Sequence, residues 1–509
     1  MTFRLLVSLL PLTVVFCGNP LDPSSWATGE VAKWSALNTE RGPHRGVHDG
    51  RDGVVAGTSN AIAVHAAKLA LLNGGSAADA AIVASTASIV WALGRYIHQG
   101  FVRQPEVAQL LEEVARDPRF IYNDPEFQRE FHAISGASVE ELQSYRSFVS
   151  PAFQFRFADA NLYSSPAPPD YGGASLAERL HLIELFQIST ADTQSNSTAL
   201  AVSAVIEQTS LFLTSLMLRG LGSVRALQET PSFAPVFPPP QITGMSDFNH
   251  RRASLQHASR LHDQMATMGL ESWSKSLSEL SALKDLDRVP VGGGHSDHVA
   301  VIDREGGAVS FTHTLNALPY GSQKFLRGCA LANPNVPGIN NALLRNWSPE
   351  GAPFYVPTSL QPVAAFQDRS LLAFGSVGES LQAYTACAAV GLLARGIAAE
   401  DMPSIPCLRY ALPLGGPRVG LLVPCEGGSE GEVDPLCERW GGQTVPFPSA
   451  MIASLPRWTE KFCDVASPDI RLKEGLAMYV ATGLPVFCSR SADGNFGGGA
   501  SFFVNGRAL

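Results

Sequence analysis

The sequence is short of positive charge, and this shortage excludes a class of partner. Lys and Arg number 37 against 46 Asp and Glu, which gives a net charge of −9, and the basic residues form no runs. A nucleic-acid-binding surface needs clustered cations that face the phosphates. We therefore expect no nucleic-acid partner. With 509 residues and 45% hydrophobic content, the chain can bury large cores, which also excludes a disordered protein.

Cysteine is scarce in the N-terminal half, and metal-binding patterns are missing. Apart from Cys17, the cysteines all lie in the C-terminal part, at Cys329, Cys387, Cys407, Cys425, Cys437, Cys463 and Cys488. Seven is an odd number, so at least one thiol should stay unpaired, and the spacing does not give the pairing. The sequence has no Cys-x-x-Cys pair. His295 and His298 are three residues apart on an extended segment, where they point to opposite faces. We expect no metal and no other cofactor.

A long apolar run is also absent, although a shorter one opens the chain. Residues 5–16 are mostly apolar and two small residues follow them, which is typical of a secretory signal peptide. A membrane span needs ~20 apolar residues. We predict a signal peptide over residues 1–18 and a protein that is secreted or stays in the secretory pathway; an uncleaved N-terminal membrane anchor is the alternative. Asn196 and Asn346 lie in sequons and are candidate glycosylation sites.

The spacing of apolar residues predicts both helices and strands. Val54 and Val55 indicate a short buried strand, residues 61–72 a helix, and Ser76 the start of a second, Ala-rich helix. Further expected elements are a helix that ends at Asp117–Pro118, strands at Phe153–Phe157 and Leu162–Tyr163, an amphipathic helix around Leu176–Phe186, an extended Pro-rich connector over 232–244, a helical stretch over about Leu255–Leu283, and a helix after Gly378.

The most informative segment is GGGHSDHVAVIDREGGAVSFTHTLN, in which three glycines lead to Ser296. Glycines allow a sharp turn or a close approach of the backbone. The residues that follow alternate in polarity on both sides of a turn at 304–307, which predicts two strands. Ser296 should therefore lie at the lip of a buried sheet. Taken alone, it would be interpreted as an ordinary turn serine.

Six stretches in order along the chain together resemble gamma-glutamyltranspeptidase (glutathione hydrolase), a family of N-terminal nucleophile (Ntn) hydrolases. They are GVVAGTSNAIAVHAAKLALLNGGSAADAAI, YSSPAPPDYGGAS, HSDHVAVIDREGGAVSFTHTLN, PTSLQPV, FGSVGES and SADGNFGGGAS. The resemblance implies an α+β fold, a four-layer αββα sandwich, and a precursor that cuts itself between His295 and Ser296. It divides the chain into an N-terminal arm (19–52), a large-subunit-like part (53–295) and a catalytic, small-subunit-like part (296–509), which would remain together as a heterodimer.

The resemblance places Ser296 where the family has its nucleophilic threonine. The serine hydroxyl would attack the preceding carbonyl, giving an ester by an N-to-O acyl shift, which water then hydrolyses. The freed α-amine has an ordinary pKa of ~7.7–8.0, which suits a general base for its own hydroxyl at neutral pH. Asp297 is interpreted as structural or as a modifier of self-cleavage, and His298 as a packed strand residue.

The resemblance also implies the rest of the catalytic and binding residues. Thr314 is expected beside the nucleophile, and Asn316 at the substrate. Thr358 and Ser359 match the hydroxyl pair that binds the substrate carboxylate. Gly378 and Glu379 match the two residues whose backbone N–H groups hold the tetrahedral oxyanion, although Glu379 adds a charged side chain there. Those two belong, with Ser296 and Thr314, to the expected catalytic set.

Two departures from the family concern the recognition of a glutamyl group. Only WALGRYIHQG separates Val90 from Phe101, where the family has a far longer stretch with a carboxylate-binding arginine, so part of the N-terminal half is expected to be missing. A gene model that has lost an exon would leave the same gap. The family also has an acidic pair that binds the α-amine of the substrate, and the corresponding segment of this chain, NNALLRNW, has no acidic residue. Loss of one buried charged partner costs ~3–5 kcal/mol.

Three functions therefore remain open. The leading hypothesis is a gamma-glutamyl acyltransferase and hydrolase that cleaves glutathione or its conjugates and passes the acyl group to an amine or to water. The second is an Ntn amidase of the same fold with an altered acyl specificity, which the two departures favour. The third is a non-catalytic secreted relative whose chain stays intact.

Overall fold

A computed structural model describes most of the chain. The described residues are 21, 25–37, 45–50, 52–57, 61–96, 105–146, 149–165, 171–189, 197–283, 296–314, 324–331, 360–377, 381–398, 402, 407–411, 418–422 and 484–500. The predicted signal peptide lies outside them. Within the arm, the structure places helix α1 (Glu30–Leu37) and strand β1 (Arg45–Gly50).

Seven strands form the larger of two stacked sheets, and each neighbouring pair is antiparallel. In spatial order they are β1, β14 (Phe496–Ala500), β13 (Leu484–Arg490), β10 (Ser370–Val377), β9 (Val363–Gln367), β4 (Ala160–Ser164) and β3 (Phe153–Phe157). The predicted strands at Phe153–Phe157 and Leu162–Tyr163 are confirmed as β3 and part of β4. Strands from the beginning, middle and end of the chain thus share one sheet.

The smaller sheet has the order β2-β5-β6 and is also antiparallel. Its strands are β2 (Gly53–Gly57), β5 (Ser296–Asp303) and β6 (Ala308–Thr314). Between β5 and β6 lies the predicted turn, where Gly306 has a φ of 91°, a conformation that glycine adopts without strain. The carboxylate of Asp303 accepts a hydrogen bond from the Gly307 N–H at 2.6 Å and one from the Ala77 N–H at 2.8 Å. The Asp303 side chain therefore joins the hairpin turn to the start of helix α3 (Ala77–Tyr96).

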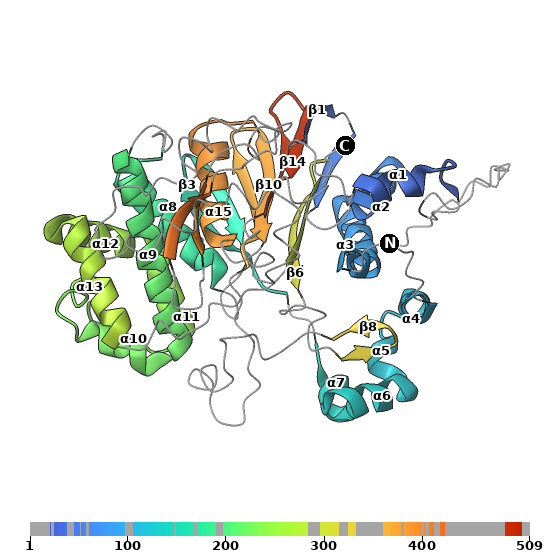
Figure 1. The fold of residues 1–509 in the computed structure, drawn as a ribbon, viewed down its shortest axis with the longest axis horizontal. Helices are drawn as coiled ribbons and strands as arrows, with labels where there is room; N and C mark the ends of the chain where they lie inside the picture. The colour runs from blue at the N-terminus through green and yellow to red at the C-terminus, as the bar shows by residue number, and fades with distance from the viewer. Residues whose placement is uncertain are drawn as a thin grey trace, which may run out of the picture.

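Helices cover the outer faces of both sheets, which gives the predicted four-layer αββα sandwich. Figure 1 shows α2 (Ala61–Leu72) and α3 (Ala77–Tyr96) beside the smaller sheet, and α8 (Gly172–Leu185) with α15 (Leu381–Ala389) on the far side of the larger one. Beyond them lie α9 (Ser197–Arg219), α10 (Leu221–Gln228), α11 (Met245–Arg252), α12 (Leu255–Met268) and α13 (Leu270–Leu283). The bounds of α2 confirm the helix predicted from the sequence.

Alternation along the strands explains the two apolar layers. Val54, Ala56, Ala300 and Ile302 face the larger sheet, where they pack against residues of β10, β13 and β14. The next residues along the same strands, such as Val55, face the opposite way and pack against the alanine-rich sides of α2 and α3. Side chains alternate between the two faces of a strand. Strands β2 and β5 of the smaller sheet are thus buried on both faces, whereas β6 is partly exposed.

The helical stretch predicted over about Leu255–Leu283 is confirmed; it consists of two helices, because Gly269 has a φ of 77° between α12 and α13. One expectation for the helical layer is corrected. The Pro-rich segment 232–244 is not an extended connector: it folds in turns, since Phe233 and Phe237 are buried in the core that the helices share with the larger sheet. Apolar burial decides both the packing and the local shape of that segment.

The segment after α3 forms a small lobe of its own, at the lower right of Figure 1. It contains α4 (Pro105–Arg116), α5 (Phe120–Asn123), α6 (Pro125–Ser135), α7 (Val139–Ser144) and the short hairpin β7 (Phe325–Leu326) and β8 (Cys329–Ala330). The helix break predicted at Asp117–Pro118 is confirmed. Leu110, Phe127 and Leu326 make the core of the lobe. Arg327 pairs with Glu130 at 3.0 Å and ties the hairpin to α6.

The remaining described elements are few. A separate hairpin joins β11 (Cys407–Ala411) and β12 (Arg418–Leu422), and a π-helical turn, η3 (Val390–Ala394), continues α15. Cys387 forms a disulfide, whereas Cys329 and Cys488 are free thiols. The expectation of at least one unpaired thiol is therefore confirmed. In the part of the chain that the structure covers, no helix is both long and apolar enough to cross a membrane.

Candidate active site

Ser296 is the first residue of β5, directly opposite Thr314, the last residue of β6. Both side chains are half-buried. Residues that face each other across an antiparallel pair project to the same side of the sheet. Thr314 therefore lies beside Ser296, where the family resemblance places it; the catalytic roles of the two remain predictions.

The face on which Ser296 lies is turned toward the larger sheet. Two and four residues further along β5, His298 and Ala300 share that face, and Ala300 belongs to the core between the sheets. Opposite them on β6 stand Thr312 and Ser310. The hairpin thus carries a row of hydroxyl groups and one imidazole, which runs from Ser296 at the lip into the gap between the sheets.

His298 is fully buried in this row, and its ring lies against the backbone of β10. A Cβ placed on Gly375 would clash with the His298 ring, so this close approach requires glycine. Burial lowers the pKa of His298 to about 3; Asp297 opposes this effect and His313 adds to it. The interpretation of His298 as a packed strand residue is confirmed. At neutral pH its imidazole is uncharged.

The hydrogen bonds of His298 fix which ring nitrogen carries the proton. Ser310 Oγ lies 2.9 Å from the carbonyl of Phe374, which can only accept, so the single Ser310 proton goes there. Ser310 Oγ must then act as the acceptor in its contact with His298 Nε2, at 3.4 Å. The same oxygen also accepts a hydrogen bond from the Val363 N–H at 2.9 Å. The proton is therefore on Nε2, and Nδ1 accepts from the Thr312 hydroxyl at 2.7 Å. This network joins β5 and β6 to β9 and β10.

Asp297 lies on the opposite face of β5, away from the row of hydroxyl groups. Its carboxylate contacts His313 Nε2 at 3.2 Å, from the facing position of β6. The His313 ring stacks on Phe311 at a centroid distance of 5.3 Å. Asp297 therefore does not face the same side as Ser296. This position agrees with a structural role or with an effect on self-cleavage better than with direct acid catalysis.

The other predicted site residues lie outside the described residues. They are Asn316, Thr358, Ser359, Gly378 and Glu379, together with His295 and the sequon residues Asn196 and Asn346. Their roles stay predictions. The described chain nevertheless resumes next to two of these pairs: Leu360 follows Ser359, and α15 begins two residues after Glu379.

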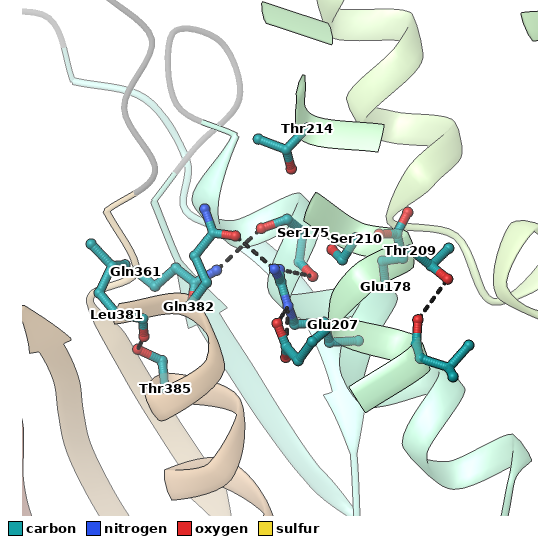
Figure 2. Close-up of polar contacts among 12 residues, drawn as sticks. Ser175, Glu178, Glu207, Thr209, Ser210, Thr214, Gln361, Leu381, Gln382 and Thr385 are labelled. Carbon is teal, nitrogen blue, oxygen red and sulfur yellow. Dashed lines mark hydrogen bonds and ion pairs between the residues drawn. The ribbon is translucent and has the colours of Figure 1, made fainter. Parts of the chain in front are cut away.

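A network of buried charges beneath the larger sheet was missed by the sequence reasoning. The helix predicted as amphipathic, α8, is buried on all sides over residues 172–183. Arg179 on α8 pairs with Glu207 of α9 at 2.9 Å, and Arg252 of α11 pairs with Glu178 at 2.7 Å. Figure 2 shows this region, with Glu207 on α9 and Gln382 on α15. The helix is rich in Leu and Ala and carries three charged residues, Glu178, Arg179 and Glu184, and nothing in their local spacing signals that the first two are buried.

Among the described residues, no group of three or more His, Cys, Asp or Glu side chains is placed to hold a metal ion. Around Ser296, the described residues of β5 and β6 supply hydroxyl groups and the neutral imidazole of His298. A serine hydroxyl at a strand end, beside a second hydroxyl, is suited to nucleophilic attack once a base removes its proton.

Solved structures show which fold this arrangement belongs to. A cephalosporin acylase from Bacillus halodurans is similar over 92% of this chain and 97% of its own, with a TM-score of 0.57 and 13% identity. Two structures of LmbA2991 each have a TM-score of 0.50 and 12% identity; one covers 84% of this chain and 72% of its own, the other 94% and 93%. No protein-family model and no curated protein sequence matches the chain.

These similarities, at such low identity, concern the fold. The chain shares its αββα fold with these proteins, and Ser296 lies at the start of a strand of the smaller sheet. Membership of the gamma-glutamyltranspeptidase family, self-cleavage and a missing N-terminal segment stay predictions.

Proposed function

We propose that this chain is an Ntn-type amide hydrolase that cleaves itself before Ser296 and then uses the Ser296 hydroxyl as its nucleophile. The observation that supports this most is the pairing of Ser296 with Thr314 at the start of β5, on the face between the two sheets. The structures of similar fold include one named as an acylase, which agrees with amide chemistry.

The proposed reaction needs only the chain's own groups. After self-cleavage, the α-amine of Ser296 takes the hydroxyl proton while Oγ attacks the substrate carbonyl. Collapse of the tetrahedral intermediate breaks the C–N bond, and the leaving amine takes the proton from the α-ammonium. Water or a second amine then attacks the acyl-enzyme by the same steps in reverse. Thr314 would orient the Ser296 hydroxyl, and backbone N–H groups at Gly378 and Glu379 would hold the oxyanion.

For the acyl group, we propose a gamma-glutamyl amide such as glutathione or a glutathione conjugate. The support is the set of six collinear motifs, which includes Thr358 and Ser359 for the substrate carboxylate. A second candidate is an amidase for acyl groups without an α-amine, because the sequence lacks the arginine and the acidic pair that would bind the two charges. We also propose a secreted heterodimer of the two fragments, glycosylated at Asn196 and Asn346.

The test begins with the intact mass of protein made through a secretory pathway. Wild type should give two fragments, the second beginning at Ser296. Ser296→Thr keeps the β-hydroxyl and should be cut, whereas Ser296→Ala should stay whole. A wild-type chain that stays whole, with no adduct from an electrophilic glutamine analogue, would overturn the proposal in favour of a non-catalytic protein.

Substrate choice is then settled with matched anilides. Gamma-glutamyl and glutaryl p-nitroanilide differ only by the α-amine, and adipyl p-nitroanilide extends the chain by one carbon. A higher kcat/KM for the gamma-glutamyl compound supports glutathione chemistry. An equal or higher value for the glutaryl or adipyl compound supports the second candidate.

A further inference from the structure

One face of α8 holds two segments that are far apart in the sequence. Gly172, Ser175 and Arg179 are spaced by three and four residues, so they lie on the same side of the helix. Near this face lie Gln361, which precedes β9, and Gln382, in the first turn of α15 (Figure 2). Each of the two glutamines is at most 3% exposed.

Arg179 fixes the beginning of α15. Its Nη2 donates to the Gln382 side-chain oxygen at 2.7 Å, and its Nη1 donates to the Ser175 carbonyl at 3.1 Å. Its Nε lies 3.0 and 2.9 Å from the two carboxylate oxygens of Glu207, which neutralise the buried charge. All five donors of a guanidinium lie in one plane, so these contacts set the direction of Gln382 as well as its distance.

Gln361 fixes the segment that enters β9. Its Nε2 donates to the Gly172 carbonyl at 2.8 Å and to Ser175 Oγ at 3.2 Å. On either side of Gln361, the carbonyls of Leu360 and Pro362 accept from serine hydroxyls at the end of β4, both at 2.9 Å. Three consecutive residues are therefore held by side-chain hydrogen bonds at one place.

Both segments continue into residues that the sequence assigns to the site. Leu360 is bonded to Ser359, of the expected carboxylate-binding pair, and Gln382 is three residues after Glu379, of the expected oxyanion pair. The same connection reaches the nucleophile strand, because β10 precedes α15 and its Phe374 carbonyl accepts from Ser310 of the hairpin that carries Ser296. One helix face thus contacts both chain segments that frame the site.

We propose that Arg179 is a positioning residue for catalysis, which holds the start of α15 through Gln382, and that Gln361, bound to the same face of α8, positions the substrate-binding segment. This inference rests on the proposed function. A buried ion pair adds little stability over well-packed apolar side chains, but its fixed geometry can specify one arrangement. Here that arrangement is the placement of Gln361 and Gln382 on one face of α8.

The experiment compares three substitutions with two matched controls, using the anilide that wild type cleaves faster. The variants are Arg179→Met, Gln382→Met and Gln361→Met. The first control is Arg252→Met, because Arg252 is equally buried but pairs with Glu178 and otherwise contacts Ser210 and Thr214. The second control is Thr209→Val, which removes a buried hydrogen bond to Trp273. All are assayed at a temperature where circular dichroism shows the folded protein.

Arg179→Met and Gln382→Met should each lower kcat ~10- to 100-fold with little change in KM, because misplaced oxyanion donors weaken transition-state binding. The double variant should be no worse than either single one, since both remove the same contact. Gln361→Met should mainly raise KM. The two controls should lower the melting temperature yet keep kcat and KM near wild type.

Three results would overturn the inference. One is unchanged kcat in Arg179→Met, a second is an equal loss in Arg252→Met, and a third is additive losses in the double variant. If wild type shows neither self-cleavage nor turnover, the proposed function fails, and the inference fails with it. If wild type is active and only the pattern among the variants differs, the inference alone is wrong.

Discussion

The imidazole of His298 in β5 lies directly against the backbone of Gly375 in β10, so that the two sheets touch through a ring and a glycine. His298 is two positions after Ser296 on the same face of the strand. This contact therefore sets how closely β5 approaches β10 beside Ser296. It leads to the first prediction.

Gly375→Ala should destabilise the protein by ~1–3 kcal/mol, since the added methyl group must displace the buried ring. The matched control is Gly222→Ala in α10, where a Cβ meets no atom within 4 Å and the helix favours alanine. That control should be neutral or stabilising by up to ~1 kcal/mol. Urea unfolding of both variants measures the difference. Equal stability of the two would show that the ring moves aside at no cost.

The second prediction concerns stability against pH. Because burial lowers the pKa of His298 to about 3 from an ordinary 6.5, the unfolded chain binds a proton there between these values while the folded chain does not. The contribution of His298 is complete above pH 6.5 and falls as pH decreases toward 3, by up to ~1.4 kcal/mol per pH unit.

His298→Gln keeps a neutral hydrogen-bonding side chain and removes the titration. The unfolding free energy of wild type, measured from pH 7 to 4, should fall more steeply than that of the variant. His65 and His181, whose pKa values burial also lowers, are present in both proteins and cancel in the comparison. Parallel curves would mean that folding does not lower the pKa of His298.

Parts of this structure followed from the sequence, and the reasons are local. The helix Ala61–Leu72 and the hairpin around residues 304–307 were predicted because apolar spacing and turn glycines specify them within one segment. The break at Gly269 was missed because helical spacing continues on both sides of it. Facing residues such as Ser296 and Thr314 were placed together by the family resemblance. The buried contacts of Arg179 depend on helices that are distant in sequence, which no local pattern contains.

The third prediction uses the ion pair between Glu178 and Arg252. Burial alone raises the pKa of Glu178, but Arg252 and His257 outweigh it and lower the pKa to about 2. The stabilising contribution of Glu178 is therefore present above its ordinary value of 4.5 and is lost as pH falls toward 2. Glu178→Gln should cost ~3–5 kcal/mol at pH 7, because Arg252 is left buried without its charged partner.

The pH range separates this effect from a simple packing loss. Wild type and Glu178→Gln should converge in stability between pH 4.5 and 2, as measured by urea unfolding at low pH. A constant offset between the two proteins over this range would show that folding does not lower the pKa of Glu178.

The fourth prediction concerns Asp303, which accepts from the Ala77 N–H at the start of α3 and from the Gly307 N–H in the hairpin turn. A carboxylate at a helix N-terminus is stabilised by the exposed N–H groups and the helix dipole. Asp303→Asn keeps the shape but removes the charge and leaves one oxygen in place of two, so it should cost ~1–2 kcal/mol. As a control, Asp52→Asn breaks an exposed ion pair of 3.7 Å with Arg304 and should change stability by less than ~0.5 kcal/mol.

Hydrogen exchange at the Ala77 and Gly307 amides locates the effect. If the Asp303 carboxylate joins α3 to the hairpin of Ser296, both amides should exchange faster in Asp303→Asn and at an unchanged rate in Asp52→Asn. Unchanged protection would show that the turn and the helix hold their positions independently.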